Sequence, residues 1–238
     1  MTERLYDDLA PWWPVLSPPE TYAEEAAFLV DQLQRAVDGP LERVLELGAG
    51  GGHLASHLPA SLEVVLVDRA PAMLAQSRAL NPGRAHIQAD LRSLRLDRSF
   101  DGVLLHDAVM YLTTEEDLAR AFATAAAHCR PGAAFLVLPD VVKESFGEQT
   151  LGGGGEEGDR AARMMEWHWD PDPTDDTFQV EMAYLLREGR GPVRSVHETH
   201  VMGLFSRDTW WRLLGEAGFE PVEATPRPEG ELFLTRRR

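Results

Sequence analysis

The sequence predicts an α/β protein with a doubly wound, mostly parallel sheet and an inserted antiparallel β cap. Between residues 41 and 140, short apolar runs alternate with helical patterns through short connections. This alternation indicates parallel strands with helices on both faces of the sheet. A glycine-rich turn follows the first apolar run, and residues 141–203 break the alternation. These observations give the fold class and the position of the cap.

Residues 41–140 contain five expected strands and three helical stretches. The apolar runs are 43–48, 62–68, 85–90, 100–106 and 133–140. The helical patterns are 53–58, 70–80 and 114–129. The third helix has the clearest ends, because a threonine cap and acidic residues stand at its start and Arg130-Pro131-Gly132 follows it.

Two further segments are expected to lie over this core. Residues 141–203 include a glycine run, 151–159, that we expect to be a flexible loop. Antiparallel strands should follow it, at 166–170, 177–189 and 192–205, before a helix and a last strand near the C-terminus. The expected domains are a lid segment at 1–40, the main domain at 41–140 and 204–238, and a substrate-binding cap at 141–203.

The charge and composition argue against several classes of protein. The 238 residues carry 39 acidic and 23 basic side chains, and the formal net charge of −16 repels nucleic acid. No run of about 18 apolar residues indicates a membrane span, and the first residues lack the pattern of a secretion signal. We therefore expect a cytoplasmic protein with no nucleic-acid or membrane partner. The oligomeric state stays open, with a homodimer as one option.

The glycine turn does not fit the common nucleotide-binding patterns. In G-x-G-x-x-G read from Gly48, the sixth position is His53, and a reading from Gly50 starts beyond the end of the strand. No lysine stands nearby for a Walker loop. The turn reads instead as Glu46-Leu-Gly48-Ala-Gly50-Gly-Gly52, an acidic residue before a G-x-G-x-G turn, where glycine lets a ligand approach the backbone.

This motif and the ones that follow it resemble class I S-adenosylmethionine-dependent methyltransferases, which implies a Rossmann-like sheet with an antiparallel last strand. Asp68 ends the second strand, Asp90 ends the third, and residues 100–112 and 129–140 resemble the fourth- and fifth-strand motifs. The resemblance implies that Glu46 meets the cofactor's amino group, Asp68 its ribose and Asp90 its adenine. The implied cofactor-binding residues are Glu46, Gly48, Ala49, Gly50, Asp68, Arg69, Met73, Asp90, Leu91 and His106.

The segments outside this core resemble bacterial aminosugar N-methyltransferases. The similarity covers residues 196–219 and the N-terminal segment, where Tyr22 matches a tyrosine near the transferable methyl group. It implies a small-molecule methyl acceptor, with an amine preferred over a hydroxyl, and S-adenosylhomocysteine as the product. One departure is Ser17-Pro18-Pro19, where such relatives have a basic residue for the cofactor carboxylate. Arg4, or hydroxyl and backbone donors, would replace that residue.

Candidate catalytic residues follow the fourth strand and lie on the last strand of the cap. His106, Asp107 and Tyr111 stand where the acceptor should meet the methyl group. Glu198 and His200 are two residues apart, so they share one face of a strand and could form a carboxylate-oriented base. The expected catalytic residues are His106, His200 and Tyr22, and the expected acceptor contacts include Asp107, Tyr111 and Glu198.

Four tryptophans in the two outer segments are candidates for an aromatic acceptor pocket or for the core of the cap. They are Trp12, Trp13, Trp167 and Trp169. No metal site is expected, because the HETH sequence at 197–200 lacks the spacing of a zinc helix. An O-methyltransferase, a dinucleotide-dependent oxidoreductase and a non-methylating S-adenosylmethionine-binding protein remain as alternatives.

Overall fold

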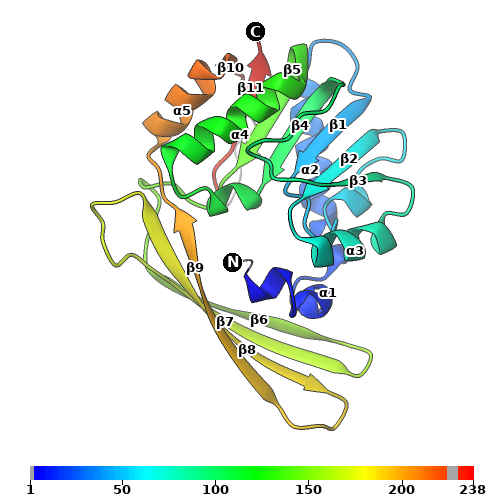
Figure 1. Ribbon diagram of the computed structural model, residues 1–238, viewed down its shortest axis with the longest axis vertical. Helices are drawn as coiled ribbons and strands as arrows, with labels where there is room; N and C mark the ends of the chain where they lie inside the picture. Colours follow the sequence, from blue (N-terminus) through cyan, green and yellow to red (C-terminus); the bar gives the residue numbers. More distant parts are fainter. Residues whose placement is uncertain (1–2, 224–229) are drawn as a thin grey trace.

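The larger sheet has seven strands and forms the centre of the molecule (Figure 1). The computed structural model describes residues 3–223 and 230–238. The strand order is β10-β11-β5-β4-β1-β2-β3. The strands are Arg43–Leu47 (β1), Glu63–Asp68 (β2), Ala85–Gln88 (β3), Phe100–His106 (β4), Cys129–Leu138 (β5), Phe219–Pro221 (β10) and Phe233–Arg237 (β11). Strands β1 to β5 pair in parallel and β11 runs antiparallel to β5. The predicted fold class is confirmed.

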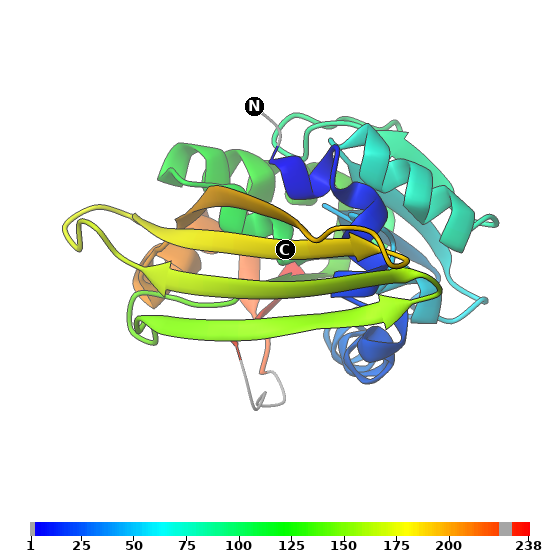
Figure 2. The same ribbon diagram turned by 90° about the horizontal axis from the view of Figure 1, so that it is seen from below.

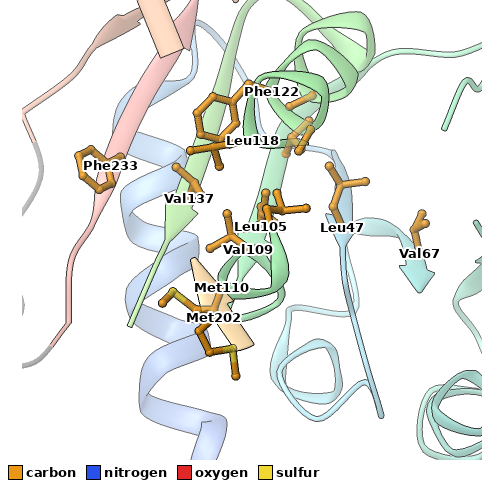
Figure 3. Close-up of a cluster of buried hydrophobic side chains, with 14 of the residues drawn as sticks. Leu47, Val67, Leu105, Val109, Met110, Leu118, Phe122, Val137, Met202 and Phe233 are labelled. Atoms are coloured by element: carbon orange, nitrogen blue, oxygen red, sulfur yellow. The ribbon is translucent and has the colours of Figure 1, made fainter. Parts of the chain in front are cut away.

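Helices cover both faces of this sheet because its strands are apolar on both sides. The helices are Ala23–Ala36 (α2), Pro71–Leu80 (α3), Glu115–His128 (α4) and Arg207–Glu216 (α5). Leu104 packs in a cluster with Leu29 and Leu33 of α2, whereas Leu105 packs in the cluster that includes Phe122 of α4 (Figure 3). Successive side chains of β4 thus point to opposite faces of the sheet, and each face packs against a layer of helices.

A separate sheet of four antiparallel strands follows β5 and precedes α5. Its strands are Gln149–Glu157 (β6), Arg160–Trp169 (β7), Thr177–Glu188 (β8) and Arg194–Gly203 (β9), in the order β6-β7-β8-β9. The four strands lie side by side across one end of the molecule (Figure 2). This sheet occupies the part of the chain where the inserted antiparallel cap was expected.

The expectation of a flexible loop at 151–159 is wrong, because most of this glycine run belongs to β6. Glycine fits this strand because neighbouring backbone lies close to it. A Cβ atom on Gly154 would stand 2.2 Å from the Ala162 carbonyl oxygen, and one on Gly155 would stand 2.8 Å from the Val15 carbonyl oxygen. The run therefore serves close packing between strands and against the N-terminal segment.

The N-terminal segment lies between the two sheets (Figures 1 and 2). It consists of short helical turns at Arg4–Tyr6 (η1), Ala10–Trp12 (η2), Trp13–Leu16 (α1) and Pro19–Tyr22 (η3). Turn α1 contacts β6 and β7, whereas η2 contacts α3 of the main domain. The segment therefore touches both halves of the molecule.

The expected helix at 53–58 is reduced to one short turn, Ala55–His57 (η4). Leu58 ends this turn with an extended backbone, and the residue that follows it is Pro59. A residue before proline is disfavoured in the helical region, so the helix cannot continue there. Within residues 3–223 and 230–238, no helix is long and apolar enough to span a bilayer.

Candidate active site

Three glycines of the turn after β1 adopt left-handed backbone conformations. The φ angles are +77° at Gly48, +52° at Gly50 and +74° at Gly52. A Cβ atom on Gly48 would stand 2.2 Å from Ala108 Cβ, and one on Gly52 would stand 2.3 Å from Ser77 Oγ. Of these three glycines, Gly48 and Gly50 line the cavity beside the turn and Gly52 does not. Ligand approach therefore explains part of the motif, whereas Gly52 is required for packing against α3.

A cavity opens where β1, β2 and β4 end, at the carboxyl edge of the parallel strands. In open α/β sheets, ligands bind at this edge. The cavity brings together every residue that the sequence implied for cofactor binding, and four other candidates. The sequence-predicted residues that line it are Trp13, Tyr22, Glu46, Gly48, Ala49, Gly50, Asp68, Arg69, Met73, Asp90, Leu91, His106, Asp107 and Tyr111.

Asp68 ends β2 and holds the glycine turn by its carboxylate. Oδ2 accepts a hydrogen bond from the backbone N–H of Gly50, and Oδ1 accepts one from Ala70, both at 2.8 Å. Burial raises the pKa of Asp68, and these two N–H donors act against that rise. Each oxygen keeps a further lone pair, so the carboxylate can still accept hydrogen bonds from a diol.

Glu46 is a buried residue whose carboxyl group has an unpaired oxygen atom. The residue is 3% exposed, and its Oε2 atom has no hydrogen-bond partner among the described residues. Burial raises the pKa of Glu46 to about 7, although His106 nearby lowers it. An unpaired buried oxygen is costly unless a ligand supplies the partner. The position thus fits a cationic ligand group, such as an ammonium.

Asp90 and Arg69 line the same cavity but already have partners in the protein. Asp90 Oδ2 lies 2.6 Å from Arg92 Nη2, and this hydrogen-bonded pair lowers the pKa of Asp90. Arg69 pairs with Glu3 at 2.8 Å. An adenine amino group would therefore share the Asp90 carboxylate with Arg92. The position of Asp90 after a strand in the sequence could not predict this pairing.

His106 ends β4 between two carboxylates. Its Nε2 atom lies 3.2 Å from Glu25 Oε1 and 3.1 Å from Asp107 Oδ1. Burial lowers the pKa of His106, but Asp107, Glu25 and Asp140 outweigh this effect and raise it to about 9. The ring is therefore an imidazolium at neutral pH, and an imidazolium has no free electron pair with which to accept a proton.

A second cavity lies between the main domain and the four-stranded sheet and shares part of its wall with the first. The shared residues are Tyr6, Trp13, Asp107 and Tyr111. Its other polar residues are Ser17, Asp140, Glu166 and His168, and its apolar wall consists of Leu5, Leu16, Met110, Met164, Phe178, Val180, Met182 and Met202. No lysine or arginine is among the described residues that line this cavity.

Two carboxylates stand together where the cavities meet. Burial and the neighbouring Asp107 carboxylate raise the pKa of Asp140 well above its ordinary value. Asp107 has φ +45°, an unfavourable backbone angle for a residue other than glycine. The turn after β4 thus holds Asp107 against both Asp140 and His106, and this part of the site favours positively charged ligands.

Five predicted acceptor or catalytic residues lie outside both cavities. Trp12 is buried under Arg160, whose guanidinium carbon is 5.5 Å from the ring centroid. Trp167 and Trp169 stack on each other, with centroids 5.5 Å apart, on the face of β7 opposite to Glu166 and His168. Alternation along the strand thus corrects this expectation: the residues beside the tryptophans, not the tryptophans, face the cavity.

Glu198 and His200 share a face of β9, as their spacing predicted, but reach the cavities only through other side chains. His200 is 1% exposed, and its Nδ1 atom lies 2.8 Å from the Tyr111 hydroxyl. On the opposite face, His197 Nε2 and Thr199 Oγ1 both contact Glu181 Oε2, at 2.7 and 2.8 Å. The expected division of the strand into two faces is thus present.

Sequence reasoning missed Tyr6, Asp140, Glu166 and His168. Asp140 lies just after the end of β5, in the way that Asp68 lies at the end of β2, so its position in the sequence could have marked it as a site residue. Nothing local marks Tyr6, because its position depends on where the N-terminal segment folds back. In residues 3–223 and 230–238, no group of three or more His, Cys, Asp or Glu side chains could hold a metal ion.

The central part of the chain matches a known family. Residues 44–132 match the model of a methyltransferase domain. Among curated proteins, the dTDP-3-amino-3,4,6-trideoxy-alpha-D-glucopyranose N,N-dimethyltransferase of Streptomyces venezuelae is 26% identical over 219 residues, which cover 90% of each chain. The matched segment contains the glycine turn, Asp68, Asp90 and His106, so the predicted methyltransferase and its cofactor, S-adenosylmethionine, are confirmed.

Solved structures share the whole architecture. The crystal structure of DesVI from Streptomyces venezuelae has a TM-score of 0.83 at 22% identity and covers all of both chains. The structure of CalS10, an amino pentose methyltransferase from Micromonospora echinaspora, has a TM-score of 0.79 at 23% identity and covers 100% of this chain and 98% of that one. The fold, including the four-stranded sheet, is therefore that of these proteins.

Proposed function

Because the chain is an S-adenosylmethionine-dependent methyltransferase, we propose that it methylates the amino group of a small, positively charged molecule. The observation that carries this proposal is the acidic second cavity, which meets the cofactor cavity at Asp107 and Tyr111. The curated relative named above is an aminosugar N,N-dimethyltransferase, which supports an amine as the acceptor. We further propose that it acts in secondary metabolism, in the cytoplasm.

The residues of the first cavity fit S-adenosylmethionine. Glu46 would take its ammonium group, Asp68 the ribose hydroxyls, and Met73 and Leu91 the adenine ring. Arg4 pairs with Asp8 and does not line the cavity. We therefore assign the cofactor carboxylate to hydroxyl and backbone donors near Tyr22. The cofactor supplies a methyl group on a positively charged sulfur, which the carboxylates of the cavity help to hold.

The second cavity suits an amine that enters as a cation. Asp107 and Glu166 attract it, and the aromatic rings of Tyr6 and Trp13 add a surface that a cation or an apolar ring can contact. Methyl transfer to nitrogen requires mainly alignment and exclusion of water. The N-terminal segment would exclude water as a lid, and the cap would bind the acceptor.

Phosphate-bearing acceptors fit this chain poorly. The relative's substrate carries a dTDP group, according to its name. Here, the described lining of the second cavity has the carboxyl groups of Asp107, Asp140 and Glu166 and no lysine or arginine. Like charges in a shared cavity disfavour binding, so we propose an amine without a nucleotide. Nucleic acids are disfavoured as acceptors for the same reason.

An acceptor panel tests the proposal. Purified protein is incubated with methyl-labelled S-adenosylmethionine and either 3-amino-3-deoxy-D-glucose, tyramine or 4-methylphenol, and products are identified by mass spectrometry. We expect label on the amines. Glu166→Gln should raise KM for the amines several-fold, because it removes one charge from the cavity. Glu181→Gln, on the opposite face of the cap sheet, should leave KM unchanged. Label on 4-methylphenol alone would contradict the proposal.

A further inference from the structure

We propose that Tyr6, Tyr111 and His200 form a hydrogen-bonded wire that takes up the proton which the acceptor amine must lose, with Glu198 holding the wire in place. This inference rests on the proposed amine acceptor. An ammonium nitrogen has no free electron pair, so it cannot attack a methyl group before it loses a proton. The structure therefore needs a proton acceptor within reach of the second cavity.

The four side chains come from separate parts of the chain and meet between the N-terminal segment and the cap. The Tyr6 and Tyr111 hydroxyl oxygens lie 2.8 Å apart. The Tyr111 oxygen lies 2.8 Å from His200 Nδ1, and His200 Nε2 lies 3.3 Å from Glu198 Oε2. Both tyrosines line both cavities, whereas His200 is 1% exposed. The wire thus begins at the acceptor and ends in the protein interior.

The contacts of the wire set the direction of its hydrogen bonds. His200 Nε2 makes no hydrogen bond among the described residues, but the negative charge of Glu198 at 3.3 Å favours the proton of neutral His200 on Nε2, which leaves Nδ1 as the acceptor. Tyr111 then donates to Nδ1, and the Tyr111 oxygen accepts the hydroxyl proton of Tyr6. Tyr6 consequently presents a lone pair to the cavity, where an ammonium can donate to it.

The proton passes through the side chains in the order Tyr6, Tyr111, His200. The N–H bond of the bound ammonium breaks, and the nitrogen keeps the electron pair. Tyr6 Oη gains that proton as its own hydroxyl proton passes to the Tyr111 oxygen, and the hydroxyl proton of Tyr111 passes to His200 Nδ1. Both tyrosines end as neutral phenols, and His200 becomes an imidazolium beside Glu198. No proton is lost or gained overall, and the two tyrosines never carry a lasting charge.

Glu198 is a positioning residue and connects the wire to the N-terminal segment. Its Oε2 and Oε1 atoms accept hydrogen bonds from the backbone N–H groups of Arg4 and Leu5, at 2.8 and 3.1 Å. These two residues precede Tyr6 directly, so the same carboxylate orients His200 and places Tyr6. The wire is therefore complete only when the N-terminal segment is docked.

Several charged and titratable groups face the wire from the elements packed against it. Tyr184 of β8 faces Glu198, and Glu3, Asp107, Asp140 and Glu166 act on the tyrosines through their charge. Arg4, a cationic side chain on which the charge of Glu198 acts, is engaged by Asp8. By contrast, His106 already carries a proton at neutral pH, so it does not compete for this role.

The test compares wild type with Tyr111→Phe and His200→Gln, using 3-amino-3-deoxy-D-glucose as acceptor over a range of pH. His197→Gln is the matched control, since it changes the same residue type on the opposite, exposed face of β9. We expect about a tenfold or greater loss of kcat near neutral pH in both wire variants. The loss should shrink as the pH passes the amine's own pKa, because the amine then arrives neutral.

Two further measurements separate this role from a structural one. Calorimetry should give S-adenosylhomocysteine affinities within about twofold of wild type for His200→Gln and His197→Gln, which change residues outside both cavities. In protein with 13C-labelled histidine and bound S-adenosylhomocysteine, adding the aminosugar should shift the His200 signal to its imidazolium position, and Tyr111→Phe should abolish the shift.

A loss of kcat that is equal at every pH, or no loss in either wire variant, would overturn the wire while leaving N-methylation intact. If wild type methylates the aminosugar at oxygen only, the proposed function itself fails, and the two failures are thus distinguishable. If Tyr111→Phe does not fold, Tyr6→Phe can replace it in the same pH test. This variant removes the hydroxyl group at the end of the wire that lines the second cavity.

Discussion

The Asp68 carboxylate oxygen Oδ2 lies 2.8 Å from the backbone nitrogen of Gly50, so the side chain assigned to the ribose also holds the glycine turn in place. The two functions are linked, because the turn forms one wall of the cavity and Asp68 forms the next. A change at this carboxylate therefore acts on cofactor binding in two ways.

Asp68→Ala should lower the affinity for S-adenosylhomocysteine by more than about tenfold. Two hydrogen bonds from ribose hydroxyls to a charged acceptor are lost, at roughly 1.5–3 kcal/mol each before compensation. Titration calorimetry measures the change. Asp68→Asn keeps one acceptor oxygen and therefore one of the two backbone hydrogen bonds, and it should also bind more weakly than wild type. An unchanged affinity in both variants would remove Asp68 from the site.

Glu46→Gln should stabilise the protein at high pH and weaken ligand binding. The pKa of Glu46 is raised from 4.5 to about 7 in the folded state. The stability that the protonated side chain contributes is therefore present below about pH 4.5 and is lost as the pH rises through about 7. The neutral glutamine avoids this loss, which is about 3.4 kcal/mol at most.

Thermal melting checks this prediction. Tm of Glu46→Gln should exceed that of wild type at about pH 8, and the difference should disappear towards about pH 4.5. Calorimetry should show weaker binding of S-adenosylhomocysteine by the variant at the higher pH. If the variant is less stable than wild type throughout, Glu46 has a cationic partner within the ligand-free protein.

Gly52→Ala should destabilise the fold more than Gly158→Ala. Both glycines have positive φ, +74° and +60°, so each alanine costs about 1–2 kcal/mol in backbone strain. Only at Gly52 would the new Cβ atom also meet neighbours, at 2.3 Å from Ser77 Oγ and 2.5 Å from Asn81 Nδ2. Equal shifts in Tm for the two variants would show that packing against α3 does not require this glycine.

Nucleotide-linked aminosugars should be poorer acceptors than free ones. With the same 3-amino sugar presented free and as its dTDP derivative, kcat/KM for the free form should be at least about tenfold higher, because the cavity carboxylates repel the diphosphate. The difference should fall as salt is added, since salt screens the repulsion. A preference for the dTDP form would reveal a phosphate site outside the second cavity.

The cofactor half of the site could be predicted because its chemistry is local in sequence. Glu46, Asp68 and Asp90 each stand at the end of one strand, and parallel strands bring their ends to the same edge. Periodicity in the apolar runs was enough to find those ends. Even here, the pairing of Asp90 with Arg92 depends on side-chain geometry that spacing does not encode.

The acceptor half could not be predicted in the same way, because it depends on which parts of the chain meet. The glycine run at 151–159 lacks side-chain alternation, and its strand is stabilised by contacts with β7 and with α1. A one-residue difference along β7 decides whether Glu166 or Trp167 faces the cavity. The meeting of Tyr6 with Tyr111 joins residues 105 positions apart.

The most direct measurement of the central claim uses one molecule that carries both kinds of nucleophile. Purified protein is incubated with 13C-methyl S-adenosylmethionine and 3-amino-3-deoxy-D-glucose, and the position of the labelled methyl group is read from the carbon chemical shift and its couplings. The account predicts one or two labelled methyl groups on nitrogen and none on oxygen. A labelled methyl group on a hydroxyl oxygen, or an aminosugar that stays unlabelled while 4-methylphenol is methylated, would contradict it.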